Sequence, residues 1–252
     1  MNSALVVVNP KKYDRIGVVG DLHGDYKALD ALLGLVDLNR DLLVFLGDYA
    51  DRGAFGVETI RRVAALHKEH PNNVVALMGN HEDYTNYGEP KFSPATLINE
   101  AEAKVGSWNR FFKDEFKPFI DSLQLSALIQ GNALLVHGGV SSKLTKIDDL
   151  KSPSADLRLD ILWSDPFDGE GERPNRRGAG VEFGADVSAS VCRALGVERI
   201  IRSHQPMIAK NKPHYAHGGR VVTVQATSVY DGVPLIYFID PVSSKNDYYI
   251  KR

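Results

Sequence analysis

Short apolar runs with the length of β-strands recur along the chain, and turn-forming residues bound them. Most are rich in β-branched residues and predict buried strands at Ile16–Val19, Leu42–Leu46, Val74–Met78, Leu134–Val136, Ile200–Ile201, Val221–Val224 and Leu235–Ile239. Between them, apolar residues recur with helical spacing over 26–36, 57–66 and 108–123. The first half therefore alternates strand and helix, and the part from residue 221 is mostly strand. This order predicts an α/β (α+β) fold in which helices cover a sheet core.

Composition limits the class of protein. The 252 residues suit one large domain or two small ones, and no Gly-, Ser- or Pro-rich linker divides them. Lys and Arg total 30 against 32 Asp and Glu, a net charge of −2 that disfavours a dominant nucleic-acid-binding role. The single Cys192 excludes an intramolecular disulfide and a cysteine-rich zinc site. The N-terminal run Ala4–Val8 is too short for a signal-peptide core or a membrane span, so we expect a soluble, cytoplasmic protein without a membrane partner.

Polar clusters follow five of the predicted strands, in each case directly after the apolar run. Each contains Asp, Asn or His, and the five comprise Gly20–Gly24, Gly47–Gly53, Gly79–Glu82, His137–Gly139 and Arg202–His204. Ligands of α/β proteins bind in the crevice outside the carboxyl ends of the strands. Glycine, present in four of the clusters, allows sharp turns and close approach of a ligand. Each cluster alone is a common turn or a structural histidine, whereas a shared metal site accounts for all five together.

The donor atoms in these clusters indicate the type of metal. Asp and His with an Asn carbonyl, and no Cys, suit divalent metals of intermediate hardness such as Mn, Fe, Co or Zn. Calcium and magnesium sites use oxygen ligands almost exclusively. The candidate ligands outnumber what one ion needs, so we expect two ions, an arrangement that activates water and holds a phosphate.

In their order and spacing the clusters resemble the PPP-type serine/threonine phosphoprotein phosphatases, a branch of the binuclear metallophosphoesterases, with core motifs GDxHG, GDxxDRG, GNHE, HGG and RxH. The segments Leu162–Pro166 and Asn175–Gly178, with Phe183 and Gly184, are similar to the family's LWSDP and NxRG…FG stretches. The resemblance extends from about residue 17 to residue 230 and is that of a compact, prokaryote-like member. It implies one catalytic domain over residues 1–252: a metallophosphoesterase-like β-sandwich of two mixed sheets flanked by helices, with the active site at the strand carboxyl ends.

The resemblance also assigns metal ligands and a reaction. Six residues would bind two ions: Asp21 and His23 the first, Asp48 both as a bridge, and Asn80, His137 and His204 the second. We expect manganese, with iron, zinc or cobalt as alternatives. The reaction of the family is hydrolysis of phosphoserine and phosphothreonine monoesters in phosphoproteins or phosphopeptides, by attack of a hydroxide that bridges the ions.

Further residues receive catalytic roles from the same resemblance. His81 would be the general acid that protonates the leaving oxygen, and Asp51 would orient its ring. Arg52 and Arg177 would bind the phosphate oxygens, a task that suits the guanidinium fork. Tyr230 resembles the tyrosine of a loop over the active site, although the surrounding sequence does not reproduce the family's SAPNYxG.

Several features differ from the eukaryotic catalytic subunits. We expect their N-terminal helical extension to be lacking, and Ala50 and Ser203 replace the usual Val and Ala. These differences leave no regulatory subunit inferable. Arg202 has two open roles, binding phosphate or bracing the site from behind. The stretch 165–184, with five glycines and two prolines, predicts a long surface loop.

Other functions stay open at this point. A symmetrical dinucleoside-polyphosphate hydrolase shares the metal motifs, although Asp51–Gly53 and Asn80–Glu82 resemble the protein phosphatases more closely. Phosphotyrosine activity is also open, because the motifs define the metal site and not the depth of the pocket. A purple-acid-type phosphatase needs a tyrosine at the position of Asp51. A non-catalytic phosphoprotein-binding module would be expected to have lost ligands, and none is missing.

Overall fold

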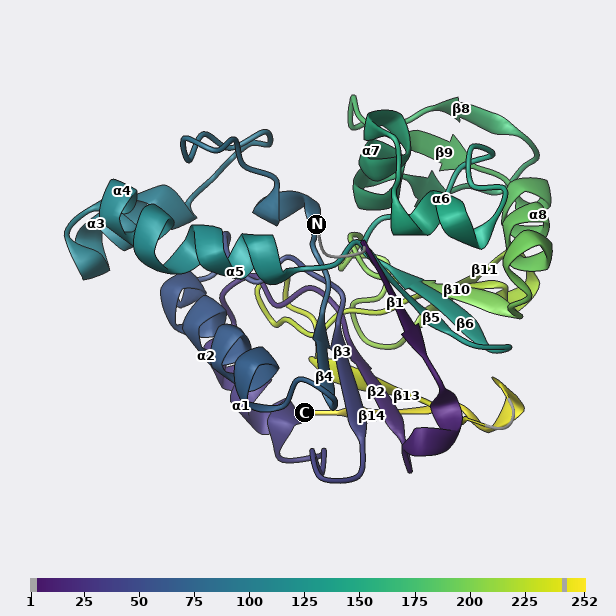
Figure 1. The fold of residues 1–252 in the computed structure, drawn as a ribbon, viewed down its shortest axis with the longest axis horizontal. Helices are drawn as coiled ribbons and strands as arrows, with labels where there is room; N and C mark the ends of the chain where they lie inside the picture. Colours follow the sequence, from purple (N-terminus) through teal and green to yellow (C-terminus); the bar gives the residue numbers. More distant parts are fainter. Residues whose placement is uncertain (1–3, 242–243) are drawn as a thin grey trace.

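Two mixed β-sheets lie at the centre of the computed structural model, which describes residues 4–241 and 244–252 (Figure 1). The first sheet has the strand order β14 (Tyr248–Lys251), β13 (Leu235–Ile239), β2 (Ile16–Val19), β3 (Leu42–Phe45) and β4 (Val74–Ala76). The second has the order β1 (Leu5–Val8), β5 (Ser126–Ile129), β6 (Ala133–Val136), β10 (Arg199–Arg202), β12 (Val221–Thr223) and β11 (His214–Ala216). Strands β2, β3 and β4 are parallel to one another, as are β6, β10 and β12. The predicted fold class is confirmed.

The central strands are buried on both faces, which explains why their sequences are continuous apolar runs. In β3, Leu43 and Phe45 pack on the helix side. Its alternate residues, Leu42 and Val44, enter a cluster that also contains Leu135 of β6. Residues of both sheets therefore share one interior cluster, so the sheets pack face to face.

Helices cover the two outer faces of this sandwich (Figure 1). On the side of the five-stranded sheet lie α1 (Tyr26–Leu33), α2 (Gly56–Glu69), α3 (Leu97–Val105), α4 (Trp108–Phe111) and α5 (Lys117–Ser122), and α3 contacts α2 and α4. On the six-stranded sheet lie α6 (Ile147–Lys151), α7 (Ala155–Trp163) and α8 (Ala185–Leu195). A π-helical segment, Phe112–Phe116, joins α4 to α5, so the helix predicted over 108–123 changes its hydrogen bonding midway. Over the described ranges, no helix has the length and hydrophobicity that a membrane span requires.

The stretch 165–184 is not the long loop that its glycine content predicts. It holds a three-stranded sheet in the order β7 (Asp165–Pro166), β9 (Val181–Phe183) and β8 (Glu172–Pro174). The three residues of β8 are all exposed, and the strand pairs with β9, so its side chains carry no apolar pattern. The sequence analysis also missed β1 and β5, two short strands that pair in parallel.

Candidate active site

The five polar clusters meet at the carboxyl ends of their strands, between the two sheets. Three clusters follow β2, β3 and β4 of the five-stranded sheet, and two follow β6 and β10 of the six-stranded sheet. The six predicted metal ligands are all buried: Asp21, His23, Asp48, Asn80, His137 and His204. The structure thus brings together residues up to 183 positions apart, as in the hydrogen bond from the His204 backbone to Asp21.

Asp48 lies between two groups of potential ligands. Its Oδ2 is 3.5 Å from Nε2 of His23, and its Oδ1 is 3.4 Å from Nε2 of His137. In one group, ligand atoms of His23, Asp48 and His81 lie within 4.8 Å of one another. The other group consists of Asp48, His137 and His204. One carboxylate therefore faces both groups, which is the geometry that a bridging ligand requires.

The imidazoles direct their lone pairs toward this carboxylate. Nδ1 of His23 lies 3.0 Å from the Ala50 carbonyl, and Nδ1 of His137 lies 3.0 Å from the Leu46 carbonyl. Each Nδ1 therefore donates its proton to a carbonyl, and each Nε2 keeps a lone pair. Nε2 of His137 is also 2.9 Å from Oδ1 of Asn80, so an acceptor faces an acceptor. A cation between these atoms resolves that conflict.

Two buried ligand atoms lack a hydrogen-bond partner within the described part of the chain. They are Oδ2 of Asp21 and Nε2 of His204. An unpaired polar atom in the interior is costly, and native proteins leave few of them. Both atoms belong to residues that the sequence analysis assigns to metal binding. The donor set present therefore fits a divalent metal site.

Burial sets the protonation of these groups. It lowers the pKa of His23 to about 3 and the pKa of His137 to about 3, so both rings are neutral and able to coordinate. Burial, followed by the negative charges of Asp21 and Glu82, raises the pKa of Asp48 well above its ordinary value. Carboxylates crowded into a dry site favour a cation, because a positive charge offsets their mutual repulsion.

Glu82 joins two of the clusters, a role that the sequence analysis did not assign. Its carboxylate accepts hydrogen bonds from the backbone N–H groups of Asp48 (2.9 Å), Tyr49 (3.0 Å) and Gly79 (2.8 Å). These bonds hold Asp48 in a left-handed backbone conformation, with φ of 56°. A Cβ on Gly79 would collide with Asp48, so glycine is required there. The motif GNHE includes Glu82, but its spacing carries no sign of these backbone partners.

His81 and Tyr230 both border a cavity of about 270 Å³ that opens over the candidate metal ligands. Nδ1 of His81 is 2.7 Å from Oδ2 of Asp51, whose other oxygen accepts from the Leu97 backbone at 2.7 Å. This pairing leaves Nε2 of His81 for the cavity. The Tyr230 ring stands edge-on to His23, with 5.6 Å between ring centroids.

Three arginines lie near the cavity, and two of them line it. Arg52 and Arg177 are the lining pair. Nε of Arg177 donates to Asp165 at 2.9 Å, which leaves both terminal nitrogens for a ligand. Arg202 is fully buried and does not line the cavity; it donates to the Gly138 carbonyl and, at 2.9 Å, to Asp165. Of the two roles left open for Arg202, the structure therefore favours support of the site over phosphate binding. Asp165 accepts hydrogen bonds from both Arg177 and Arg202.

Fold and site together define a metal-binding phosphoesterase. The family described as calcineurin-like phosphoesterase matches residues 14–207. The chain belongs to this family, whose site is built for divalent metal ions.

Individual proteins of known name are similar to this chain in sequence or in structure. The chain is 33% identical over 223 residues to a serine/threonine-protein phosphatase of Caenorhabditis elegans, covering 85% of this chain and 48% of that protein. It spans about half the length of the curated relatives it matches. A protein serine/threonine phosphatase of Saccharomyces cerevisiae matches in structure with a TM-score of 0.81 and 23% identity, over 99% of this chain and 84% of that one. A cold-active protein-tyrosine phosphatase of a psychrophilic Shewanella matches with a TM-score of 0.62 and 15% identity, over 94% and 77%. Both structures confirm the fold.

Proposed function

We propose that this chain is a metal-dependent phosphoprotein phosphatase that hydrolyses phosphoserine and phosphothreonine monoesters. The observation that carries the proposal is the pair of ligand groups around Asp48, beneath a cavity lined by Arg52 and Arg177. Divalent ions bound there would activate water and polarise the phosphoryl group. The name of the Caenorhabditis elegans relative supports a phosphoprotein as the substrate.

We propose two ions, with manganese as the metal. One ion is assigned to Asp21 and His23, the other to Asn80, His137 and His204, and Asp48 is shared. The support is the division of its two oxygens between His23 and His137. Both sheets supply ligands, which supports residues 1–252 acting as one catalytic domain.

The remaining site residues receive roles toward the phosphate and the leaving group. Arg52 and Arg177 bind phosphate oxygens with charge-assisted hydrogen bonds. His81 donates the proton to the leaving oxygen, and Asp51 keeps its Nδ1 protonated and its ring fixed. Tyr230 positions the substrate from the loop after β12.

A dinucleoside-polyphosphate hydrolase is the second candidate. The cavity of about 270 Å³ accommodates a phosphate and the side chain that bears it. Asp51–Gly53 and Asn80–Glu82 resemble the motifs of the protein phosphatases more closely, which favours the phosphoprotein.

Rates on four substrates test the proposal. We expect kcat/KM on phosphoserine and phosphothreonine peptides to exceed that on a phosphotyrosine peptide and on diadenosine tetraphosphate by at least about tenfold, since a poorly fitting leaving group loses contacts in the transition state. The protein is assayed with elemental analysis of its metals, before and after chelation. A higher kcat/KM on the dinucleotide would assign the site to the second candidate, and activity that survives complete chelation would contradict a metal-dependent reaction.

Replacing Arg177 by Ala should lower kcat/KM on a phosphopeptide by roughly 10²-fold, the effect of one lost donor at developing charge. Metal content should not change, because the Arg177 side chain donates to Asp165, which is not a candidate ligand. Arg176→Ala is the matched control, since that neighbouring side chain is 85% exposed and lies outside the cavity. Unchanged kinetics in Arg177→Ala would show that the segment between β8 and β9, which carries Arg177, does not reach the phosphate.

A further inference from the structure

The loop after His204 places two exposed apolar side chains at the mouth of the candidate active site. Met207 and Ile208 both line the cavity, yet 59% and 43% of their surfaces are exposed. We call this pair the Met207–Ile208 shelf. The pair offers apolar surface at the edge of a polar site, and a bound molecule can cover this surface. Because both residues line the cavity itself, a substrate bound there is the molecule in position to cover them.

The shelf is held by a tight turn. The Ile208 backbone N–H donates to the Gln205 carbonyl at 3.2 Å, which closes a four-residue turn. Pro206 occupies the second position of this turn, where its fixed φ is favoured. Met207 is therefore the third residue of the turn, where most of its surface is exposed.

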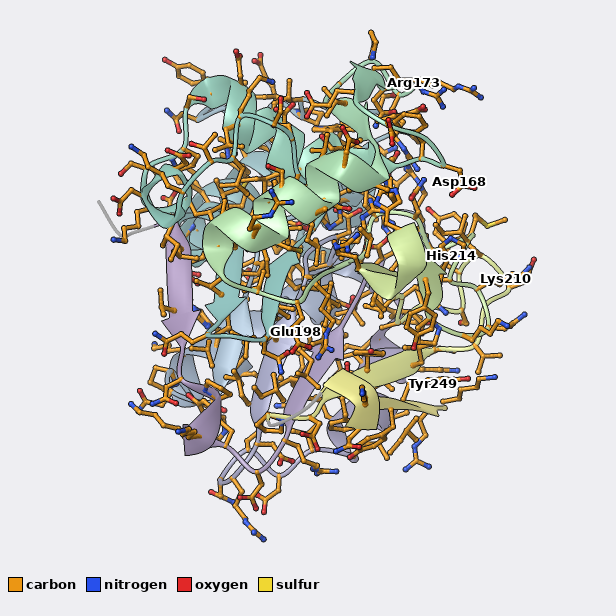
Figure 2. The ribbon with its side chains drawn as sticks, turned by 90° about the vertical axis from the view of Figure 1, so that its right-hand side faces the viewer. Asp168, Arg173, Glu198, Lys210, His214 and Tyr249 are labelled. Atoms are coloured by element: carbon orange, nitrogen blue, oxygen red, sulfur yellow. The ribbon has the colours of Figure 1, made fainter. Side chains whose placement is uncertain are left out.

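Both ends of the loop are attached to the rest of the molecule. The Gln205 side chain accepts from Nη1 of Arg202 at 2.6 Å, and Arg202 is itself fully buried. At the far end, the Lys210 carbonyl accepts from the Val233 backbone at 2.8 Å. Figure 2 shows Lys210 at the outer edge of the molecule. The shelf therefore keeps a fixed position relative to His204 and the phosphate site.

We propose that the Met207–Ile208 shelf binds an apolar side chain that flanks the phosphorylated residue of a peptide substrate. This inference rests on the proposed function and narrows its substrate class. The loop from 205 to 212 contains no acidic residue and carries Lys210 and Lys212, so it offers no partner to a basic flank. An apolar flank gains contact with two side chains that water otherwise surrounds.

A leucine scan tests the proposal. The reference is a phosphoserine peptide with alanine on both sides, and single leucines are placed at each of the three positions on either side. We expect one leucine position to raise kcat/KM about tenfold over the alanine peptide, the selectivity of a small apolar pocket. In the double variant Met207→Ser, Ile208→Ser, that leucine-to-alanine ratio should fall to near one.

The ratio of two peptides is the readout, because the alanine peptide reports any damage to the site itself. Leu159→Ser is the matched control: this side chain on α7 is 40% exposed and lies outside the cavity. It should keep the wild-type ratio. Two results would overturn the proposal for the shelf and leave the proposed function intact. One is a wild-type protein that hydrolyses the alanine peptide but prefers leucine at no position. The other is a double variant that keeps the full leucine-to-alanine ratio. A metal-loaded protein inactive on every phosphopeptide would contradict the proposed function and the shelf with it.

Discussion

Replacing His81 by Asn should lower kcat on phosphoserine peptides by about 10²–10⁴-fold, the usual span of general acid catalysis. The leaving serine oxygen is a poor leaving group unless it is protonated. Nε2 of His81 faces the cavity, and Asp51 holds the opposite nitrogen at 2.7 Å, so the ring is placed to supply that proton. The measurement is single-turnover or steady-state kcat, with metal content determined on the same preparation.

The loss should shrink on p-nitrophenyl phosphate, whose acidic leaving group needs less help from a general acid. His214→Asn is a suitable control, because His214 is exposed on β11 and does not line the cavity. An equal loss on both substrates would argue against proton donation. A loss accompanied by lower metal content would instead place His81 among the ligands, in the group that it shares with His23 and Asp48.

Asp48→Asn should lower the affinity for metal by more than about 10²-fold. Residues that merely orient a ligand cost 10–100-fold when they are lost, and Asp48 faces both ligand groups directly. Elemental analysis should give about two ions per wild-type chain and one or none per variant chain. Asp168→Asn, an exposed carboxylate at the edge of the molecule (Figure 2), controls for the change of charge. A variant with full metal content and activity would contradict the bridging role.

Although Asp48→Asn should weaken metal binding, we expect it not to destabilise the fold of the metal-free protein. The pKa of Asp48 is raised above its unfolded value, so the folded state holds the proton more tightly and loses stability as pH rises above the ordinary carboxyl range. Asparagine at this position has no such pH dependence. Thermal unfolding after chelation should therefore show the variant to be at least as stable as the wild type at neutral pH. A metal-free variant that unfolds at a lower temperature than the wild type would show that the buried Asp48 carboxylate does not destabilise the fold.

Much of the central fold follows from the sequence because its strands are buried on both faces. Strands β2 and β13 begin and end at the predicted residues, where the apolar runs stop. Strand β8 had no such signal, since its three residues are exposed and its side chains form polar contacts, such as the ion pair of Arg173 with Glu182, rather than an apolar pattern. The small sheet that carries Arg177 therefore could not be predicted from side-chain patterns.

The candidate site shows the same division. Asp21 and Asp48 could be expected together because they follow β2 and β3, neighbouring parallel strands whose carboxyl ends lie at one edge of a sheet. The contacts of Glu82 and Asp165 could not, since they depend on where distant backbone groups and arginines lie in space. The sequence pattern thus predicts the residues that face the ligand. It does not predict the residues, such as Glu82 and Asp165, that hold the site in position.

The candidate ligands come from two sheets, so ion binding and the docking of the sheets would form one coupled equilibrium. Ions that bind only the assembled site stabilise it by RT ln(1 + [L]/Kd), about 2.7 kcal/mol at one hundred times Kd. The reverse also holds: a change that loosens the contact between the sheets lowers the affinity for the ions. Leu135 lies in the shared interior cluster, two residues before His137. Replacing Leu135 by a smaller side chain should therefore lower the affinity for metal, although Leu135 is not itself a candidate ligand.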